Sequence, residues 1–307
     1  MVTKSNVEIK RDLPFDDYLS DPGTSQSMLQ ILRTGTPRHY YHSIQEDAKN
    51  SRTQTEAQAF GSLFHLLALT GEENVLKHYA RVEGCSATTK QNKQCLNEAK
   101  YWVDKVPLCG RHLNGVPDNI EAVSEDKYLT AEAMVDSINN SNLPSKLLES
   151  ALPEDREISI FFDHPRFGIQ CKARIDALSF STGAIIDIKT TSTTIGDDEQ
   201  LSKDIYFRGY HIQAAWYLRA AKLAFPETEW KTYTLLFVEK TPPYISVLRP
   251  LDDEYLRLGE IEADSMVERL SICIHDDKYP GPPEIDTIKP LDWMVRKFED
   301  DFNDPSV

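Results

Sequence analysis

Positive charge is scarce in this chain, which carries 34 Lys and Arg residues against 49 Asp and Glu residues. The formal net charge is −15 at pH 7, and an acidic chain repels nucleic acid in general. A protein that coats DNA without sequence preference is therefore disfavoured. A locally basic cleft is still compatible with a DNA substrate, because basic residues recur in one part of the chain. They are Arg166, Lys172, Arg174, Lys189, Lys203 and Arg208.

Long apolar stretches are missing as well. No apolar run approaches the roughly 18 residues that a membrane-spanning helix needs, and the polar start VTKSNVEIKRD has no signal-peptide pattern. We therefore expect a cytoplasmic protein with no membrane partner. The sequence also has no internal repeats, and its 307 residues favour one large domain or a core domain with an insertion.

Cysteine is rare too: the chain has five, and disulfides are not expected in a cytoplasmic protein of this size. Three cysteines fall between residues 84 and 113, and a histidine follows the third. Three thiolates and one imidazole form a closed tetrahedral zinc site, which is structural rather than catalytic. The predicted ligands are Cys85, Cys95, Cys109 and His112. The first two are spaced more widely than in a usual zinc knuckle, so unrelated free thiols are the alternative.

Hydrophobic periodicity predicts a helical N-terminal region followed by a sheet. Residues 25–32 read as a Ser-capped helix and residues 54–70 as the strongest helix. Gly61 in the latter indicates close approach of another backbone, and His65 is, by periodicity alone, a core or capping histidine. Further helices are predicted at 131–139, 144–152, 210–224 and 252–274. Strands are predicted at 157–162, 168–178, 184–189, 232–239 and 244–248, the first three as an antiparallel meander.

Two strands of that meander carry carboxylates. Asp176 and Asp187 lie on adjacent strands, so they meet at one end of the sheet, and Lys189 projects from the same face as Asp187. Paired carboxylates hold Mg²⁺ or Mn²⁺, which activates water for attack on a phosphodiester. The carbonyl of Ile188 could also reach the metal, and Lys189 could orient the water or stabilise the pentacovalent phosphate. A surface salt bridge is the alternative explanation of an Asp-x-Lys pair.

Taken together, these motifs resemble the PD-(D/E)XK nuclease superfamily and, more narrowly, the RecE-like exonucleases, which include the exodeoxyribonuclease VIII catalytic domain of prophages. The likeness runs from about Tyr18 to Pro283 and rests on FGSLFHLLAL, EISIFF, CKARIDAL, IIDIKTT, GYHIQAAWYL and FVEKTPPY. It implies an α/β fold with a central mixed sheet flanked by helices. We expect a helical N-terminal part at 1–83, a zinc-binding insertion at 84–113, and the nuclease core with C-terminal helices at 114–307.

The resemblance also implies roles for single residues. Glu157 is a further candidate acid, ranked lower because a Glu that opens an exposed strand is often only solvated. Iron–sulfur nucleases of the superfamily place several cysteines near the C-terminus, whereas only Cys273 lies beyond the core here, which favours zinc. The other implied roles are metal binding for Asp176 and Asp187, catalysis for Lys189, a place beside the metal for His65, and substrate positioning for Gln213 and Tyr217.

The activity that the resemblance implies is Mg²⁺-dependent degradation of linear double-stranded DNA from its ends, 5′ to 3′. The 3′ single strands left behind would serve a single-strand annealing protein in recombination. A ring-shaped homo-oligomer, a tetramer, is implied as well. Two alternatives stay open: an endonuclease of the same fold for restriction or defence, and a non-catalytic module that binds DNA or protein.

Overall fold

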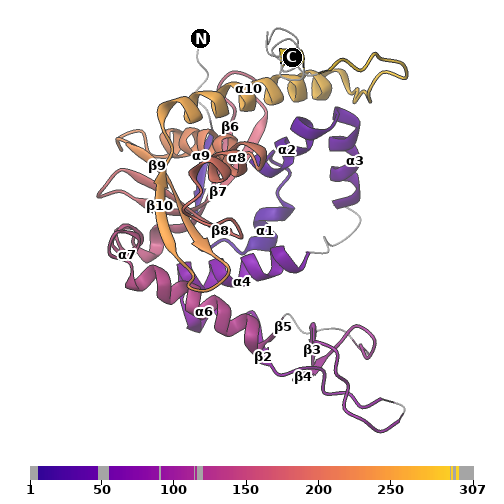
Figure 1. Ribbon diagram of the computed structural model, residues 1–307. Helices are drawn as coiled ribbons and strands as arrows, with labels where there is room; N and C mark the ends of the chain where they lie inside the picture. The colour runs from indigo at the N-terminus through magenta and orange to yellow at the C-terminus, as the bar shows by residue number, and fades with distance from the viewer. Residues whose placement is uncertain are drawn as a thin grey trace, which may run out of the picture.

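The computed structural model describes residues 6–47, 55–89, 91–113, 115, 120–290, 292 and 295–296. Within them, the larger sheet has six strands in the order β1-β6-β7-β8-β9-β10, with helices on both faces (Figure 1). The strands are β1 (Val7–Lys10), β6 (Arg156–Asp163), β7 (Gln170–Ser179), β8 (Ala184–Thr191), β9 (Thr232–Glu239) and β10 (Ser246–Pro250). Strands β8 and β9 are parallel and the other neighbours antiparallel. The predicted mixed sheet and the meander β6-β7-β8 are thus confirmed.

Strand β1 was not predicted, because its four residues, VEIK, alternate as in a strand but form a very short, half-charged segment. It pairs with β6 along Val7–Lys10. Strand β6 is therefore an interior strand, and the expectation that Glu157 opens an exposed strand is wrong.

Two helical layers cover the sheet. One layer shares a hydrophobic cluster with residues of β6, β7, β8 and β9, and the other shares a second cluster with residues of β7, β8 and β9. The first layer consists of α2 (Gln26–Thr34), α8 (Asp198–Phe207), α9 (Tyr210–Ala224) and α10 (Asp253–Asp276). The second consists of α4 (Glu56–Thr70), α6 (Glu125–Asn140) and α7 (Asn142–Glu149). The remaining helical elements are α1 (Phe15–Ser20), α3 (Pro37–Asp47), α5 (Glu72–Val75) and a 3₁₀ turn at Pro153–Asp155.

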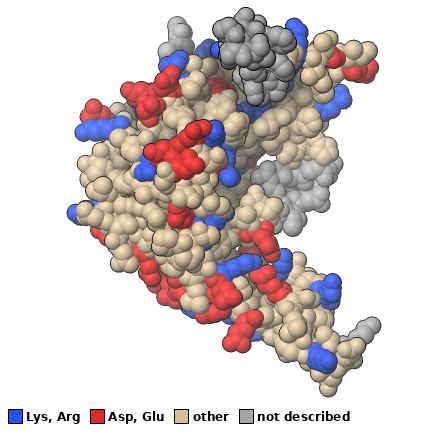
Figure 2. All heavy atoms as spheres, in the orientation of Figure 1, with Lys and Arg blue, Asp and Glu red and all other residues tan. Residues whose placement is uncertain are grey.

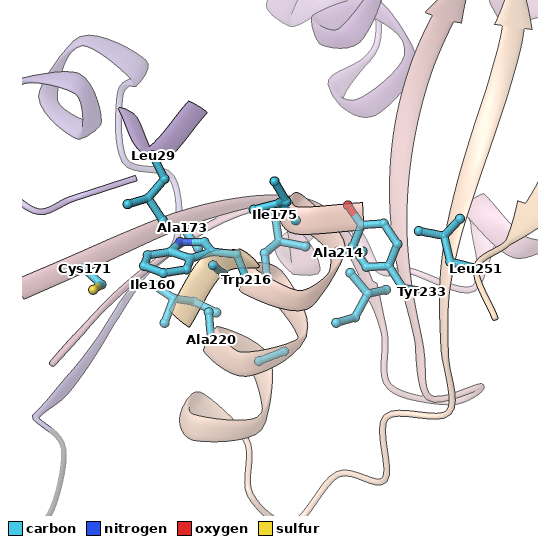
Figure 3. Close-up of a cluster of buried hydrophobic side chains, with 14 of the residues drawn as sticks. Leu29, Ile160, Cys171, Ala173, Ile175, Ala214, Trp216, Ala220, Tyr233 and Leu251 are labelled. Carbon is cyan, nitrogen blue, oxygen red and sulfur yellow. The ribbon is translucent and has the colours of Figure 1, made fainter. Parts of the chain in front are cut away.

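Local signals in the sequence begin these helices. Ser25 and Asp252 accept hydrogen bonds from the backbone at the starts of α2 and α10, and Thr55 forms a capping box with Gln58 at α4. Trp216 on α9 is fully buried against α2, β6 and β7 (Figure 3), and its Nε1 donates to the Lys172 carbonyl at 3.0 Å. One bonded indole thus fixes α9 over the strands that carry the carboxylates.

Glycine allows close helix packing at α10 but not at α4. A Cβ on Gly259 would lie 2.0 Å from the His211 carbonyl oxygen, so α9 and α10 touch backbone to backbone. A Cβ on Gly61 would meet nothing within 4 Å. The predicted close approach at Gly61 is therefore wrong, because the face of α4 that holds Gly61 is open.

A second, four-stranded sheet lies between α5 and α6 along the chain, in the order β2-β5-β3-β4. Its strands are β2 (Tyr79–Val82), β3 (Tyr101–Val103), β4 (Val106–Leu108) and β5 (Glu121–Ser124). This part projects from the core beyond α4 (Figure 1). Among the described helices, none has the length and apolarity to cross a membrane.

Candidate active site

The carboxylates lie where the ladder between β7 and β8 stops. The last pair in that ladder is Ala177 with Ile186, and the next residues outward are Asp176 and Asp187. Beyond this point β8 continues to pair with β9, and β7 with β6. The sheet therefore opens between the two carboxylates, and both are buried there, with Asp187 at 0% exposure.

Asp176 takes the place of the missing strand partner. Its Oδ2 accepts a hydrogen bond from the Ile188 N–H at 2.8 Å. The alternation of inward and outward residues also shifts at this position, since Ile175 belongs to the cluster under α9 and Ala177 to the cluster under α4. A buried backbone N–H must find an acceptor, so this bond fixes the carboxylate at the opening.

Asp187 is held from two sides. Gln213 Nε2 on α9 donates to its Oδ1 at 3.0 Å, and Lys189 Nζ lies 2.6 Å from its Oδ2. Despite the ion pair, this buried Oδ2 has no well-formed hydrogen bond from the described residues. The Tyr210 ring lies 4.9 Å from Lys189 Nζ and closes the other side of the ammonium.

His65 reaches the site from α4, on the opposite helical layer. Its Nδ1 lies 3.5 Å from Asp176 Oδ2, and a backbone hydrogen bond joins the ring to Ile188. The side chains of Asp176 and His65 therefore both form hydrogen bonds with the backbone of Ile188. The structure thus brings together His65, Asp176, Asp187, Ile188, Lys189 and Gln213 as the sequence predicted.

Glu157 is near this group but is already paired. It sits opposite Asp176 across β6 and β7, at a position where the ladder skips a pair, and has a φ of +56°. A left-handed backbone at a non-glycine residue is strained and needs support. Arg174 gives that support: its Nε and Nη2 lie 2.8 and 2.6 Å from Glu157 Oε2. Glu157 thus faces a counter-ion rather than solvent.

Tyr217 lies one helical turn after Gln213 on α9. It is half-buried, its ring lies 6.5 Å from that of Tyr233, and it bonds with Gln213. Burial raises its pKa well above the ordinary value. Tyr217 therefore supports Gln213 and, through it, Asp187.

The electrostatics of the group favour a bound cation. Burial raises the pKa of Asp176 and of Asp187 to about 6, and this effect outweighs the attraction of Lys189. Burial opposes the charge on Lys189, but the two carboxylates raise its pKa, so it remains an ammonium. Burial, with the nearby Lys189, lowers the pKa of His65, which leaves the imidazole neutral at pH 7.

These residues fit a divalent metal. Mg²⁺ and Mn²⁺ prefer oxygen ligands, and the two buried carboxylates and the Ile188 carbonyl supply them, with a neutral imidazole beside them. The poorly bonded Asp187 Oδ2 is an acceptor available to such an ion. Metal binding needs ionised carboxylates, so it is favoured above about pH 6.

The six basic residues that made a locally basic cleft compatible with the sequence are all engaged by other groups. Each of these six cations faces a carboxylate within 4.0 Å or backbone carbonyls. Lys172, for example, donates to the carbonyls of Tyr18, Leu19 and Asp21 and so fastens α1 beside β7. The others pair as Arg166–Asp264, Arg174–Glu157, Lys189–Asp187, Lys203–Glu199 and Arg208–Asp204.

A separate group of metal-binding side chains lies in the small sheet. The four predicted zinc ligands have their donor atoms within 4.8 Å of one another. Cys85 Sγ and Cys109 Sγ lie 3.5 and 3.4 Å from His112 Nδ1, and Cys95 Sγ lies 3.9 Å from Cys109 Sγ. Tetrahedral zinc with bonds of 2.0–2.3 Å spaces its ligand atoms by about 3.5–3.8 Å. The group therefore has the size and composition for zinc.

Cys109 is already prepared as a thiolate. Burial opposes ionisation, but hydrogen bonds from Asn97 and from the backbone of Arg111 and His112 lower its pKa to about 6. The Asn97 Nδ2 donor lies 3.6 Å from the sulfur. A thiolate at neutral pH is the form that binds zinc.

The chain matches the family model of a PDDEXK-like domain of unknown function (DUF3799) over residues 25–289. It belongs to this family. A crystal structure from Eubacterium rectale, of a protein provisionally named an exonuclease, shares the fold of this PDDEXK-like domain with a TM-score of 0.57. The two chains are 14% identical, and the match covers 94% of this chain and 98% of that one. No curated protein matches the chain with significance. The predicted PD-(D/E)XK fold is thus confirmed.

Sequence reasoning missed two residues of the site in this PDDEXK-like domain. Tyr210 precedes Gln213 by three positions, so helical spacing alone places it on the same face. Arg174 precedes Asp176 by two positions on one strand, and a buried strand residue with a charge needs a partner. Both signals were local, but the partners, Lys189 and Glu157, are remote in sequence.

Proposed function

We propose that the chain is a divalent-metal-dependent nuclease that cleaves DNA phosphodiesters. The observation that carries this proposal is the meeting of Asp176, Asp187 and Lys189 at the opening of the sheet, two buried carboxylates and an ammonium within one group. Family membership and fold support it.

The residues have distinct tasks in this proposal. Asp176 and Asp187, with the Ile188 carbonyl and His65 beside them, would hold the metal. Mg²⁺ or Mn²⁺ held there would supply Lewis acidity toward the phosphate and would lower the pKa of a water molecule. Lys189 stays protonated, so it stabilises negative charge on the phosphate and does not act as a general base. Gln213 keeps Asp187 oriented.

The finer activity is part of the same proposal. We take the substrate to be linear double-stranded DNA, degraded from its ends in the 5′ to 3′ direction, with 3′ single strands left for annealing in recombination. A ring-shaped homotetramer would keep the enzyme on its substrate. Sedimentation equilibrium checks the oligomer, and substrates blocked by phosphorothioates at the 5′ or the 3′ end check the polarity.

One assay separates the candidate activities. The protein is incubated with Mg²⁺ and either linear or covalently closed circular duplex DNA, beside a Lys189→Ala variant. We expect loss of linear DNA only, and a rate about 10²- to 10³-fold lower for the variant. Cutting of circles would identify an endonuclease. Absence of metal-dependent cutting on both substrates would leave a binding module.

A further inference from the structure

The segment of residues 84–113, here called the zinc module, has the opposite charge balance to the chain as a whole. It holds five basic residues, Lys90, Lys93, Lys100, Lys105 and Arg111, against Glu98 and Asp104, in a chain with a net charge of −15. Three thiolates with Zn²⁺ add a single negative charge. Figure 2 shows Lys and Arg side chains on this projecting part and acidic side chains spread over the core.

Three of these cations are available to a partner. Lys93, Lys105 and Arg111 are exposed and have no ion pair with any described residue, whereas Lys90 lies outside the described residues. Lys105 sits at the turn between β3 and β4 with a φ of +65°, so the hairpin displays it at its tip. By contrast, the cations around the carboxylates are already paired.

The other charges of the module attach it to the core. Lys100 Nζ lies 3.5 Å from Glu56 Oε1 at the start of α4, and Glu98 Oε1 lies 2.6 Å from Lys127 Nζ on α6. Glu56 precedes His65 by nine residues, which is about 14 Å along the helix axis. One turn of duplex DNA is about 34–36 Å long, so DNA bound at the carboxylates can meet the module within one turn.

We infer that the zinc module binds the phosphate backbone of the duplex whose end is in the active site, through Lys93, Lys105 and Arg111. This inference rests on the proposed function, because it takes DNA as the substrate. The zinc ion holds a segment poor in large apolar residues in one shape, and that shape carries unpaired cations out from an acidic protein. The active site then needs little basic surface of its own, since the metal and the module supply the attraction.

The test measures DNA binding against salt in the Lys189→Ala background with Mg²⁺, so that cleavage does not interfere. A module variant carries Lys93→Gln, Lys105→Gln and Arg111→Gln. A control variant carries Lys146→Gln, Lys222→Gln and Arg269→Gln, which are two exposed lysines and one exposed arginine on the core. Both variants lose the same charge. Each lost phosphate contact lowers the slope of log K against log salt by about one.

We expect the module variant to lower the slope by two to three and to weaken binding at least tenfold at 100 mM salt, order-of-magnitude values for three phosphate contacts. The control variant should change binding less than about twofold, and each single module substitution should lower the slope by about one. Zinc content is measured in every variant to show that the module is intact. Equal weakening by both triple variants, or none by either, would overturn the inference. If wild type binds DNA in this module-dependent way but does not cut it with metal, the nuclease proposal fails, and what stands is DNA binding by the module without a duplex end in an active site.

Discussion

Asp176 combines a structural and a chemical task in one side chain. Its carboxylate accepts the Ile188 N–H that lost its strand partner, and the same carboxylate faces His65 and the ammonium of Lys189. Only an acceptor can satisfy the N–H, and only a charged one can hold a divalent cation. In the proposed nuclease, this carboxylate would already be in place when a metal arrives, which is the preorganisation that catalysis requires.

Asp176→Asn should stabilise the metal-free protein. The amide oxygen can still accept from Ile188, but a buried charge is removed, and the repulsion that helps to raise the pKa of Asp187 goes with it. We expect the free energy of unfolding in EDTA at pH 7.5 to rise by on the order of 2 kcal/mol, since one pKa unit is about 1.4 kcal/mol. Denaturant titration measures it, with the exposed Asp136→Asn as a control expected to change it by less than about 0.5 kcal/mol.

The difference in the free energy of unfolding between Asp176→Asn and wild type should depend on pH, and the sign of this dependence follows from the pKa of Asp176. The pKa of Asp176 is raised from 3.8 to about 6 in the folded state, so the native protein binds more protons than the unfolded chain between these values. Wild-type stability therefore falls as pH rises from about 4 through about 6, and the advantage of Asp176→Asn grows over the same range. Mg²⁺ should then stabilise wild type and not the variant. An advantage that is constant from pH 4 to 8 would contradict the assignment.

At the scale of elements, replacing either of two helical glycines by alanine should change stability in opposite directions. Gly259→Ala places a methyl group 2.0 Å from the His211 carbonyl oxygen between α9 and α10, whereas Gly61→Ala on α4 meets open space. We expect the first to lower the free energy of unfolding by about 3 kcal/mol, because backbone cannot move aside. The second should raise it by about 0.5–1 kcal/mol through helix propensity. Denaturant titration of the pair checks both signs, and a destabilising Gly61→Ala would show a contact that the structure lacks.

The zinc module should behave as an element that depends on its metal. Cys109→Ser removes the ligand whose pKa is lowered to about 6, so zinc is lost and residues 84–113 should lose protection from hydrogen exchange. The six-stranded sheet has its own core and should stay protected. Cys171→Ser is the control: this cysteine is buried in the core cluster, so the variant should keep its zinc and lose core stability instead. A zinc-free but still protected module would refute the site.

Helices and strands with a clear local sequence pattern could be predicted, whereas the pairing and register of the strands could not. The helix at 210–224 and the strand at 232–239 have the predicted bounds, because apolar residues at helical spacing mark the first and a short run that is buried almost throughout marks the second. Strand β1 was missed because its pairing partner is more than 140 positions away. The same limit applies to the site: Asp-x-Lys is visible as a motif, but the stop in the β7–β8 ladder and the pairing of Glu157 with Arg174 arise only from strand register.

At the scale of the whole molecule, an acidic protein must attract DNA by means other than its net charge. Two features could supply this attraction: the carboxylates that would hold the metal in the proposed nuclease, and the exposed cations of the zinc module. Glu56, which pairs with Lys100 of the zinc module, and His65, which borders the carboxylates, are about 14 Å apart along α4. Effects at such a distance without shared partners usually add.

Additivity is therefore the expected outcome of a double-mutant cycle on DNA binding. One arm is Asp176→Asn with Asp187→Asn, which abolishes metal binding, and the other is the triple module variant, all in the Lys189→Ala background at fixed Mg²⁺ and ionic strength. The two losses of binding free energy should sum to within about 0.5 kcal/mol. Only the module arm should flatten the salt dependence, because metal coordination at the carboxylates is screened by salt much less than exposed cations are. A coupling above about 1 kcal/mol would mean that the two features contact the same phosphates, and the duplex would then have to bend around α4 to reach both.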